Sequence, residues 1–222
     1  MDKRFWAIIG VIVVLFGGLL VWQNKKSDNG TTGSTKGQPT NHVIGNTDSK
    51  VTLLEYGDYQ CPACEAYFTT VQEVQQKYND KIKFQFRNLP LSQIHKNAIG
   101  GARAAEAADL QGKFWQMHDA LYAVSNWQVW SNSNDPEPQF QLYAKQLGLN
   151  VDQFKKDFAS SKVNDRIQAD VAAFKKTGRD MSTPTFFVND EFVANTKLMT
   201  NGVPSVEAFS KVIDEALKKS GQ

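Results

Sequence analysis

The two cysteines of this 222-residue chain stand three positions apart, in the segment Cys61-Pro62-Ala63-Cys64. The apolar run 51–56 precedes them, and a pattern with helical spacing follows. A cysteine at the start of a helix faces unpaired backbone N–H groups and the positive end of the helix dipole, which favour the thiolate over the thiol. The second cysteine lies one turn further along nearly the same side, so the two sulfurs can reach each other. We therefore predict a redox pair in which Cys61 attacks and Cys64 resolves.

Zinc binding and chance are the two alternatives for this pair. A structural zinc site takes four protein ligands, and a catalytic site takes three with a water molecule. The chain has no second Cys-x-x-Cys, and its histidines (His42, His95 and His118) are scattered along the sequence. The position between a strand and a helix favours the redox interpretation, and we expect neither a metal nor a cofactor at the site.

An uncharged apolar run at residues 5–22 is long enough to cross a bilayer as a helix. We expect residues 1–26 to form a membrane anchor, with residues 5–22 in contact with lipid. The alternative is a cleaved signal peptide, but no small-residue cleavage site follows the run. Residues 27–42 are mostly small and polar, which predicts a flexible linker. Because a disulfide-forming pair suits an oxidising compartment, we expect the domain after the linker to lie outside the cell membrane.

The rest of the chain, residues 43–222, has the length of one domain. The pattern predicts a strand, a helix and a strand, then a long helical stretch at about 92–178, then two short strands and a last helix. Asn189 and Asp190 form the turn between the two short strands. This order predicts an α/β fold with a helical insertion. The net charge of only +2 argues against nucleic acid as a partner.

Four segments resemble the DsbA-like thiol–disulfide oxidoreductases, and in particular their membrane-anchored branch. They are VTLLEYGDYQCPAC at 51–64, RNLPL at 87–91, QGKFWQMH at 111–118 and STPTFFVN at 182–189. The resemblance implies a thioredoxin fold with an inserted helical subdomain. It also implies an enzyme that passes its disulfide to reduced exported proteins and is re-oxidised by a membrane partner of the DsbB or vitamin-K-epoxide-reductase-like type.

The same resemblance assigns roles to residues around the cysteines. It matches Glu55 to a buried acid that handles the proton of the second cysteine; the alternative is an ordinary solvated strand residue. It matches Pro184 to a cis proline beside the cysteine pair, with Thr183 presenting its backbone to the substrate; most prolines are trans, which is the alternative. Pro62 suits the first helical turn. Ala63 is a departure from the family, because several relatives carry His or another residue there that interacts favourably with the thiolate. Ala63 can offer the thiolate only its backbone N–H group.

Other candidates are better explained by packing. The tryptophans Trp115, Trp127 and Trp130 have spacing typical of a core rather than a peptide-binding platform. His95 and His118 receive the same interpretation, and Asp58 is interpreted as a turn residue. Three functions stay open: an oxidase of exported proteins, a reductase or isomerase of such proteins, and a non-catalytic scaffold module with a structural disulfide.

Overall fold

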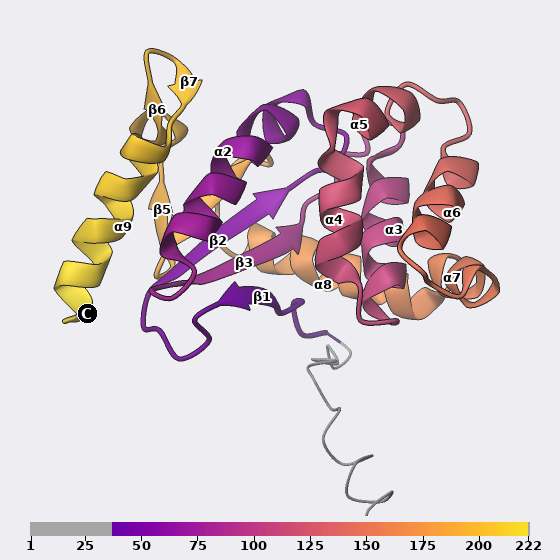
Figure 1. Ribbon diagram of the computed structural model, residues 1–222, viewed down its shortest axis with the longest axis horizontal. Helices are drawn as coiled ribbons and strands as arrows, with labels where there is room; N and C mark the ends of the chain where they lie inside the picture. Colours follow the sequence, from indigo (N-terminus) through magenta and orange to yellow (C-terminus); the bar gives the residue numbers. More distant parts are fainter. Residues whose placement is uncertain (1–36, 222) are drawn as a thin grey trace, which may run out of the picture. The chain divides into compact units, whose positions relative to one another are not determined.

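A five-stranded mixed sheet forms the centre of the domain in Figure 1, which shows a computed structural model that describes residues 37–221. The strand order is β1-β3-β2-β4-β5, and a separate two-stranded ribbon joins β6 and β7. The strands are β1 (His42–Gly45), β2 (Thr52–Gly57), β3 (Lys83–Asn88), β4 (Thr185–Val188), β5 (Glu191–Val193), β6 (Met199–Thr200) and β7 (Val203–Pro204). The helices are α2 (Pro62–Tyr78), α3 (Ala98–Asp109), α4 (Phe114–Tyr122), α5 (Val124–Trp130), α6 (Glu137–Gln146), α7 (Val151–Phe158), α8 (Ser161–Lys175), η1 (Asn195–Leu198) and α9 (Val206–Ser220).

Strand β2 lies in the middle of the sheet and carries the chain to the cysteine pair. It runs parallel to β3 and antiparallel to β4, and all but its first residue are buried. Because side chains alternate along a strand, Leu53 and Leu54 enter the two separate apolar clusters on opposite faces of the sheet. Glu55 therefore shares the face of Leu53, which is the face that α2 covers.

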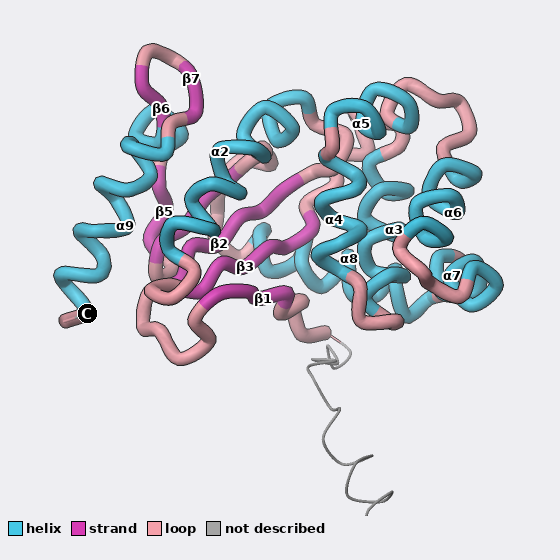
Figure 2. The backbone as a smooth tube through the Cα atoms, viewed as in Figure 1, coloured by secondary structure: helices cyan, strands magenta, loops and turns pink. Residues whose placement is uncertain are grey.

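Helices cover both faces of the sheet, as Figure 2 shows. Helices α2 and α9 pack on one face, where the rings of Tyr67 and Phe209 lie 6.3 Å apart. Helix α8 packs on the other face, and its Phe174 ring lies 5.0 Å from the Tyr56 ring of β2. The sequence pattern places α8 in the helical insertion, whereas the structure packs it on the sheet. Helical periodicity does not show which surface the apolar side of a helix covers.

Helices α3 to α7 form the inserted helical subdomain between β3 and α8, so the predicted α/β fold with a helical insertion is confirmed. The hairpin turn is also confirmed, since Asn189 and Asp190 both have positive φ angles, as a tight β4–β5 turn requires. Strand β1 and the β6–β7 ribbon were not predicted. Their segments have at most four residues each, too few for a strand pattern to stand out.

The domain begins before residue 43, which corrects the predicted end of the linker. Thr40 is fully buried, and both its backbone N–H and its hydroxyl donate to the carboxylate of Asp170 on α8. Asp170 also accepts from the backbone N–H of Asn88 at 3.0 Å. Polar composition suggested a tether, but here the polar groups satisfy a buried carboxylate instead of facing water.

A second group of buried charges joins β1 to the insertion. Burial alone would lower the pKa of His42, but the charges of Glu106 and Asp109 raise this pKa to about 9. His42 lies 2.7 Å from Glu106, and Arg166 forms ion pairs with Glu106 and Asp109. His42, Glu106 and Asp109 offer atoms within 4.8 Å of one another, a spacing that a metal ion could use. Two cations, His42 and Arg166, already balance these carboxylates, so the cluster is explained as an internal ion-pair network.

Within residues 37–221, no helix has the length and apolar character needed to span a membrane. The predicted anchor at residues 1–26 lies outside the described part of the chain, as does the linker up to residue 36.

Candidate active site

The cysteine pair lies where β2 ends and α2 begins, as the sequence pattern predicted. Cys61 is the N-cap residue of α2 and Pro62 is the first helical residue, where its missing N–H removes no helical hydrogen bond. The turn before the helix is closed by the N–H of Cys61, which donates to the carbonyl oxygen of Asp58 at 3.0 Å. Figure 1 shows β2 leading directly into this turn and α2 returning over the sheet. Both cysteines are free thiols, so the structure represents the dithiol form.

The Cys61 sulfur is the activated member of the pair. A hydrogen bond from Cys64 lowers the pKa of Cys61 to about 5, against the opposing effect of burial. Hydrogen bonding by the backbone N–H groups of Cys64 and Ala63 lowers it further. Ala63 therefore contributes through its backbone. At neutral pH the Cys61 side chain is a thiolate, which is the nucleophilic form of cysteine.

The Cys64 sulfur is kept as a thiol. Cys64 is 1 % exposed, and burial together with the neighbouring Cys61 raises its pKa well above the ordinary value. One interaction opposes this effect, because the backbone N–H of Asp58 donates to the Cys64 sulfur at 3.5 Å. The two sulfurs thus have opposite protonation states at neutral pH, as the predicted attacking and resolving roles require.

Glu55 is a buried acid on the α2 side of the sheet, which excludes the solvated alternative. Its side chain is on β2 between Phe86 of β3 and Phe186 of β4, and the residue is 4 % exposed. Burial, and secondly the charge of Cys61, raise the pKa of Glu55 to about 8. An acid with this pKa can accept and release a proton near neutral pH. Its charge acts on Cys64, so it lies within electrostatic reach of the sulfur whose proton must move.

The loop before β4 brings Thr183 and Pro184 to the cysteines from more than a hundred residues away in the sequence. The Thr183–Pro184 peptide bond is cis, as the resemblance implied. The Thr183 carbonyl oxygen lies 3.5 Å from the Cys61 sulfur and accepts its hydrogen bond in the thiol form. Asn195 donates to the Pro184 carbonyl oxygen at 3.0 Å and fixes the other side of this loop. The structure therefore assembles all seven predicted site residues around one dithiol; their individual roles stay predictions.

The active-site turn is supported by side chains that the sequence did not assign to it. The indole N–H of Trp127 donates to the Tyr59 carbonyl oxygen at 2.8 Å, and the Gln60 amide donates to the Ser131 carbonyl oxygen at 2.7 Å. Asp58 is 1 % exposed, and its carboxylate accepts from the N–H of Leu91 and pairs with His95 at 2.7 Å. Asp58 is thus a turn residue, as interpreted, but a buried one. The motif QCPAC marks the turn itself, whereas no local signal identifies its distant partners.

The aromatic candidates lie in the core, in agreement with the packing interpretation. Trp130 is fully buried, and Trp115 and Trp127 pack against the same core cluster. His118 is 3 % exposed and is surrounded by rings, with Phe86 at 4.8 Å and Tyr122 at 5.2 Å. None of these side chains forms an exposed aromatic platform.

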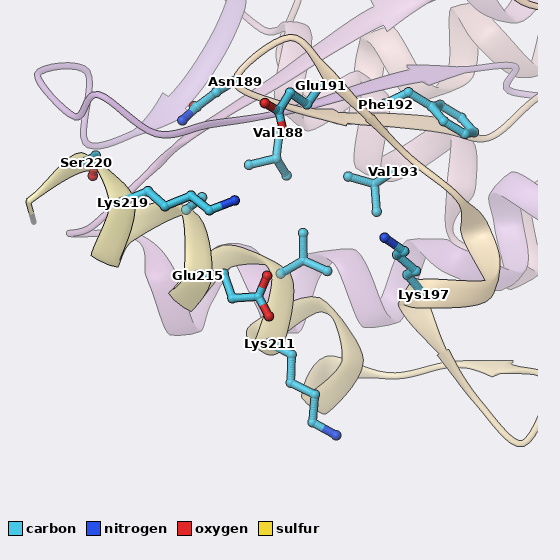
Figure 3. A pocket seen from close by; sticks show the side chains of 12 residues that line it. Val188, Asn189, Glu191, Phe192, Val193, Lys197, Lys211, Glu215, Lys219 and Ser220 are labelled. Atoms are coloured by element: carbon cyan, nitrogen blue, oxygen red, sulfur yellow. The ribbon is translucent and has the colours of Figure 1, made fainter.

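A hollow of about 660 Å³ lies apart from the dithiol. Figure 3 shows it between the β4–β5 hairpin and α9, with Phe192 and Val193 on one side and Glu215 and Lys219 on the other. None of the predicted site residues lines this hollow. The chemistry of the dithiol, and not the size of this hollow, identifies the candidate active site.

Comparisons with known proteins agree with this fold. A thioredoxin-like oxidoreductase from Silicibacter pomeroyi DSS-3 is 27 % identical with a TM-score of 0.65, covering 85 % of this chain and 99 % of that structure. Wolbachia pipientis alpha-DsbA1 is 22 % identical with a TM-score of 0.65, covering 84 % and 98 %. Oxidised BdbD from Bacillus subtilis is 22 % identical with a TM-score of 0.64, covering 83 % and 98 %. The last two likenesses support the fold alone.

Curated relatives include the Na(+)/H(+) antiporter NhaA 1 of Mycolicibacterium gilvum, which is 37 % identical over 151 residues. The match covers 67 % of this chain and 23 % of that relative, so the chain spans about a quarter of the length of the curated relatives it matches. The name of that protein describes the much longer relative as a whole.

The fold, the dithiol and these neighbours define the class as the thioredoxin-like oxidoreductases. The resemblance to the DsbA-like proteins is confirmed for the fold, and the membrane-anchored branch stays a prediction. A family model described as thioredoxin matches residues 37–215, and the chain belongs to that family.

Proposed function

We propose that the chain is an extracytoplasmic thiol–disulfide oxidoreductase that introduces disulfides into reduced exported proteins. The observation that carries the proposal is the unequal protonation of the pair: a stabilised Cys61 thiolate beside a buried Cys64 thiol. Stabilising the thiolate favours the dithiol form, so the disulfide form becomes a stronger oxidant. A scaffold disulfide would gain nothing from this arrangement, and the buried acid at Glu55 would add only a cost to folding.

The proposed reaction uses the residues already described. A substrate thiolate attacks the Cys61 sulfur of the disulfide form, the Cys61–Cys64 bond breaks, and its electron pair leaves on the Cys64 sulfur. Glu55 then supplies the proton that converts this sulfur to the thiol. A second substrate thiolate breaks the mixed disulfide and releases the Cys61 thiolate. The oxidised substrate leaves, and the dithiol requires re-oxidation.

We further propose that residues 1–26 anchor the domain in the cell membrane with the dithiol on the outer side. The uncharged run at 5–22 and the suitability of an oxidising compartment support this placement. It would put the dithiol beside a membrane re-oxidase of the DsbB or vitamin-K-epoxide-reductase-like type. Labelling intact cells with a membrane-impermeant thiol reagent tests the orientation; labelling of Cys61 only after cell lysis would refute it.

The reduction potential of the pair distinguishes the oxidase from the reductase alternative. The full-length protein in detergent micelles is equilibrated with glutathione buffers, and the dithiol fraction is measured by alkylation and mass spectrometry. An oxidase should have a potential near that of DsbA, about −120 mV, and a reductase one near that of thioredoxin, about −270 mV. A potential close to the thioredoxin value would refute the oxidase proposal.

Trapping the reaction intermediate tests the roles of the two cysteines. Cys64→Ala should leave a nucleophilic Cys61 that forms mixed disulfides with exported proteins and cannot release them. Cys61→Ala, the matched control, should trap little. Equal trapping by both variants would contradict the assigned roles.

A further inference from the structure

Three tyrosines in the core cluster around Cys64 have buried hydroxyl groups that form no hydrogen bond with any described residue: Tyr59, Tyr67 and Tyr122. A buried polar group without a partner is costly, and such groups in a native protein call for an explanation. Elsewhere in the described chain a buried tyrosine does find one: the Tyr78 hydroxyl donates to Asp214 at 2.8 Å. Each of these hydroxyls therefore has a proton available to donate to a further partner.

Tyr122 is the one whose hydroxyl lies beside the strand that leads to the cysteine pair. A Cβ placed on Gly57 would lie 3.1 Å from the Tyr122 hydroxyl oxygen, so this oxygen lies next to the end of β2. The next residue is Asp58, whose N–H donates to the Cys64 sulfur. The Tyr122 ring also lies 5.3 Å from the ring of Phe68, which stands one turn after Cys64 on α2.

The charges around Tyr122 also associate it with Cys64. Burial raises the pKa of Tyr122 well above its ordinary value, and the strongest charge acting on it is that of Cys64, followed by that of Glu55. For Tyr59 the strongest charge is that of Glu106, and for Tyr67 it is that of Glu55. A phenol that stays protonated at neutral pH keeps a proton that it can donate in a hydrogen bond, and an anionic sulfur is a strong acceptor for it.

We propose that the Tyr122 hydroxyl donates a hydrogen bond to the Cys64 sulfur whenever that sulfur is a thiolate, and so assists the step that resolves the mixed disulfide. The inference rests on the proposed function of the Cys61–Cys64 pair. It adds a residue from the inserted subdomain, on α4, to a reaction otherwise carried by β2, α2 and the Thr183–Pro184 loop.

The step is balanced without any further reactant. In the mixed disulfide, the Cys64 thiol gives its proton to the Glu55 carboxylate. The Cys64 thiolate, with the Tyr122 hydroxyl as donor, attacks the Cys61 sulfur. The Cys61–Cys64 bond forms, the bond from Cys61 to the other sulfur breaks, and the other sulfur departs as a thiolate with the electron pair. Tyr122 keeps its proton throughout, and the same contact stabilises Cys64 as a leaving group in the reverse direction.

Tyr122→Phe tests the proposal in the full-length protein in detergent micelles. The reduced protein is mixed with oxidised glutathione, and release of glutathione from the Cys61 mixed disulfide is followed by acid quench and mass spectrometry from pH 6 to 9. We expect release to slow about tenfold at neutral pH, because a hydrogen bond to a charged group is lost. The pH midpoint should rise by about one unit, since the pKa of Cys64 rises with that loss. Titratable groups from every neighbouring element face the phenol and shape this profile: Glu55, Asp58, Tyr59, Cys64 and His118.

Thermal unfolding separates this role from a structural one. Tyr122→Phe should keep the wild-type unfolding midpoint, because the hydroxyl has no hydrogen bond to lose in the resting dithiol. Tyr78→Phe is the control, because Tyr78 is a buried tyrosine at the end of α2 away from the cysteines; it should lower the midpoint by losing its bond to Asp214 while releasing glutathione at the wild-type rate.

The outcomes separate a failure of the Tyr122 inference from a failure of the proposed function. Wild-type release by Tyr122→Phe across the whole pH range would overturn the inference and leave the proposed function intact. Slowing by both variants would also overturn it, since the effect would then follow from the loss of any buried tyrosine hydroxyl and not from a hydrogen bond to Cys64. A wild-type protein that forms no mixed disulfide at all would refute the proposed function itself, and the inference with it.

Discussion

Replacing Glu55 by glutamine should stabilise the domain at neutral pH. The native carboxyl has a pKa of about 8, whereas an ordinary glutamic acid has 4.5. At pH 7 the unfolded chain would lose this proton freely, but the native protein must keep it or bury a charge. From pH 4.5 to pH 7 is 2.5 units at about 1.4 kcal/mol each, so the buried acid costs about 3 kcal/mol at pH 7. Glutamine is neutral and similar in shape, so Glu55→Gln removes this cost.

The sign and the pH window follow from proton binding. Between pH 4.5 and 8 the native state holds a proton that the unfolded state releases, so the free energy of unfolding falls as pH rises. The gain from Glu55→Gln should be near zero at pH 4, about 3 kcal/mol at pH 7 and about 5 kcal/mol at pH 9. It should be smaller in the disulfide form, because the charge of Cys61 is one cause of the raised pKa.

Urea unfolding of residues 27–222 in reducing buffer, followed by tryptophan fluorescence at the three pH values, measures these differences. Glu73→Gln is the control, because Glu73 is an exposed acid on α2 and its replacement should leave stability unchanged at each pH. A Glu55→Gln variant that is no more stable than wild type at pH 7, or whose gain does not grow with pH, would refute the reasoning about burial.

Three further outcomes are expected. Alkylation of Cys61 by iodoacetamide should increase with pH through a midpoint near 5, because the thiolate is stabilised; a midpoint near 9 would show an ordinary thiol. Gly57→Ala should lower the free energy of unfolding by about 1–3 kcal/mol, because the added Cβ would lie 2.5 Å from the Phe86 ring; an unchanged urea midpoint would show that this ring can move aside. A chain starting at residue 43 should unfold at lower urea than one starting at residue 37, because it lacks the bonds from Thr40 to Asp170; equal midpoints would mean that this contact adds nothing.

The sequence by itself determined the parts of this protein that depend on local periodicity. Alternation along β2, the helical spacing after Cys64 and the Asn189-Asp190 turn each need only a few neighbouring residues. The position of Cys61 at the start of a helix follows from the same local pattern, and with it the expectation of a reactive thiolate. The resemblance supplied the remaining members of the site, Glu55, Thr183 and Pro184, from motifs that local physics alone would have left ambiguous.

Only the tertiary structure decided the properties that depend on surroundings. Whether Glu55 is solvated or buried, and hence whether its pKa is ordinary or about 8, is set by strands and helices that close over it. From the sequence, Thr40 is interpreted as part of the linker. In the structure it is buried, because it donates hydrogen bonds to Asp170, 130 positions away. From the sequence, Tyr122 is interpreted as an ordinary core position of a helix, because no neighbouring residue shows that its hydroxyl lies beside the end of β2. The periodicity of a sequence shows on which face of its own helix or strand a side chain lies. The exposure of that side chain and the charges near it depend on which other elements the fold packs against that face.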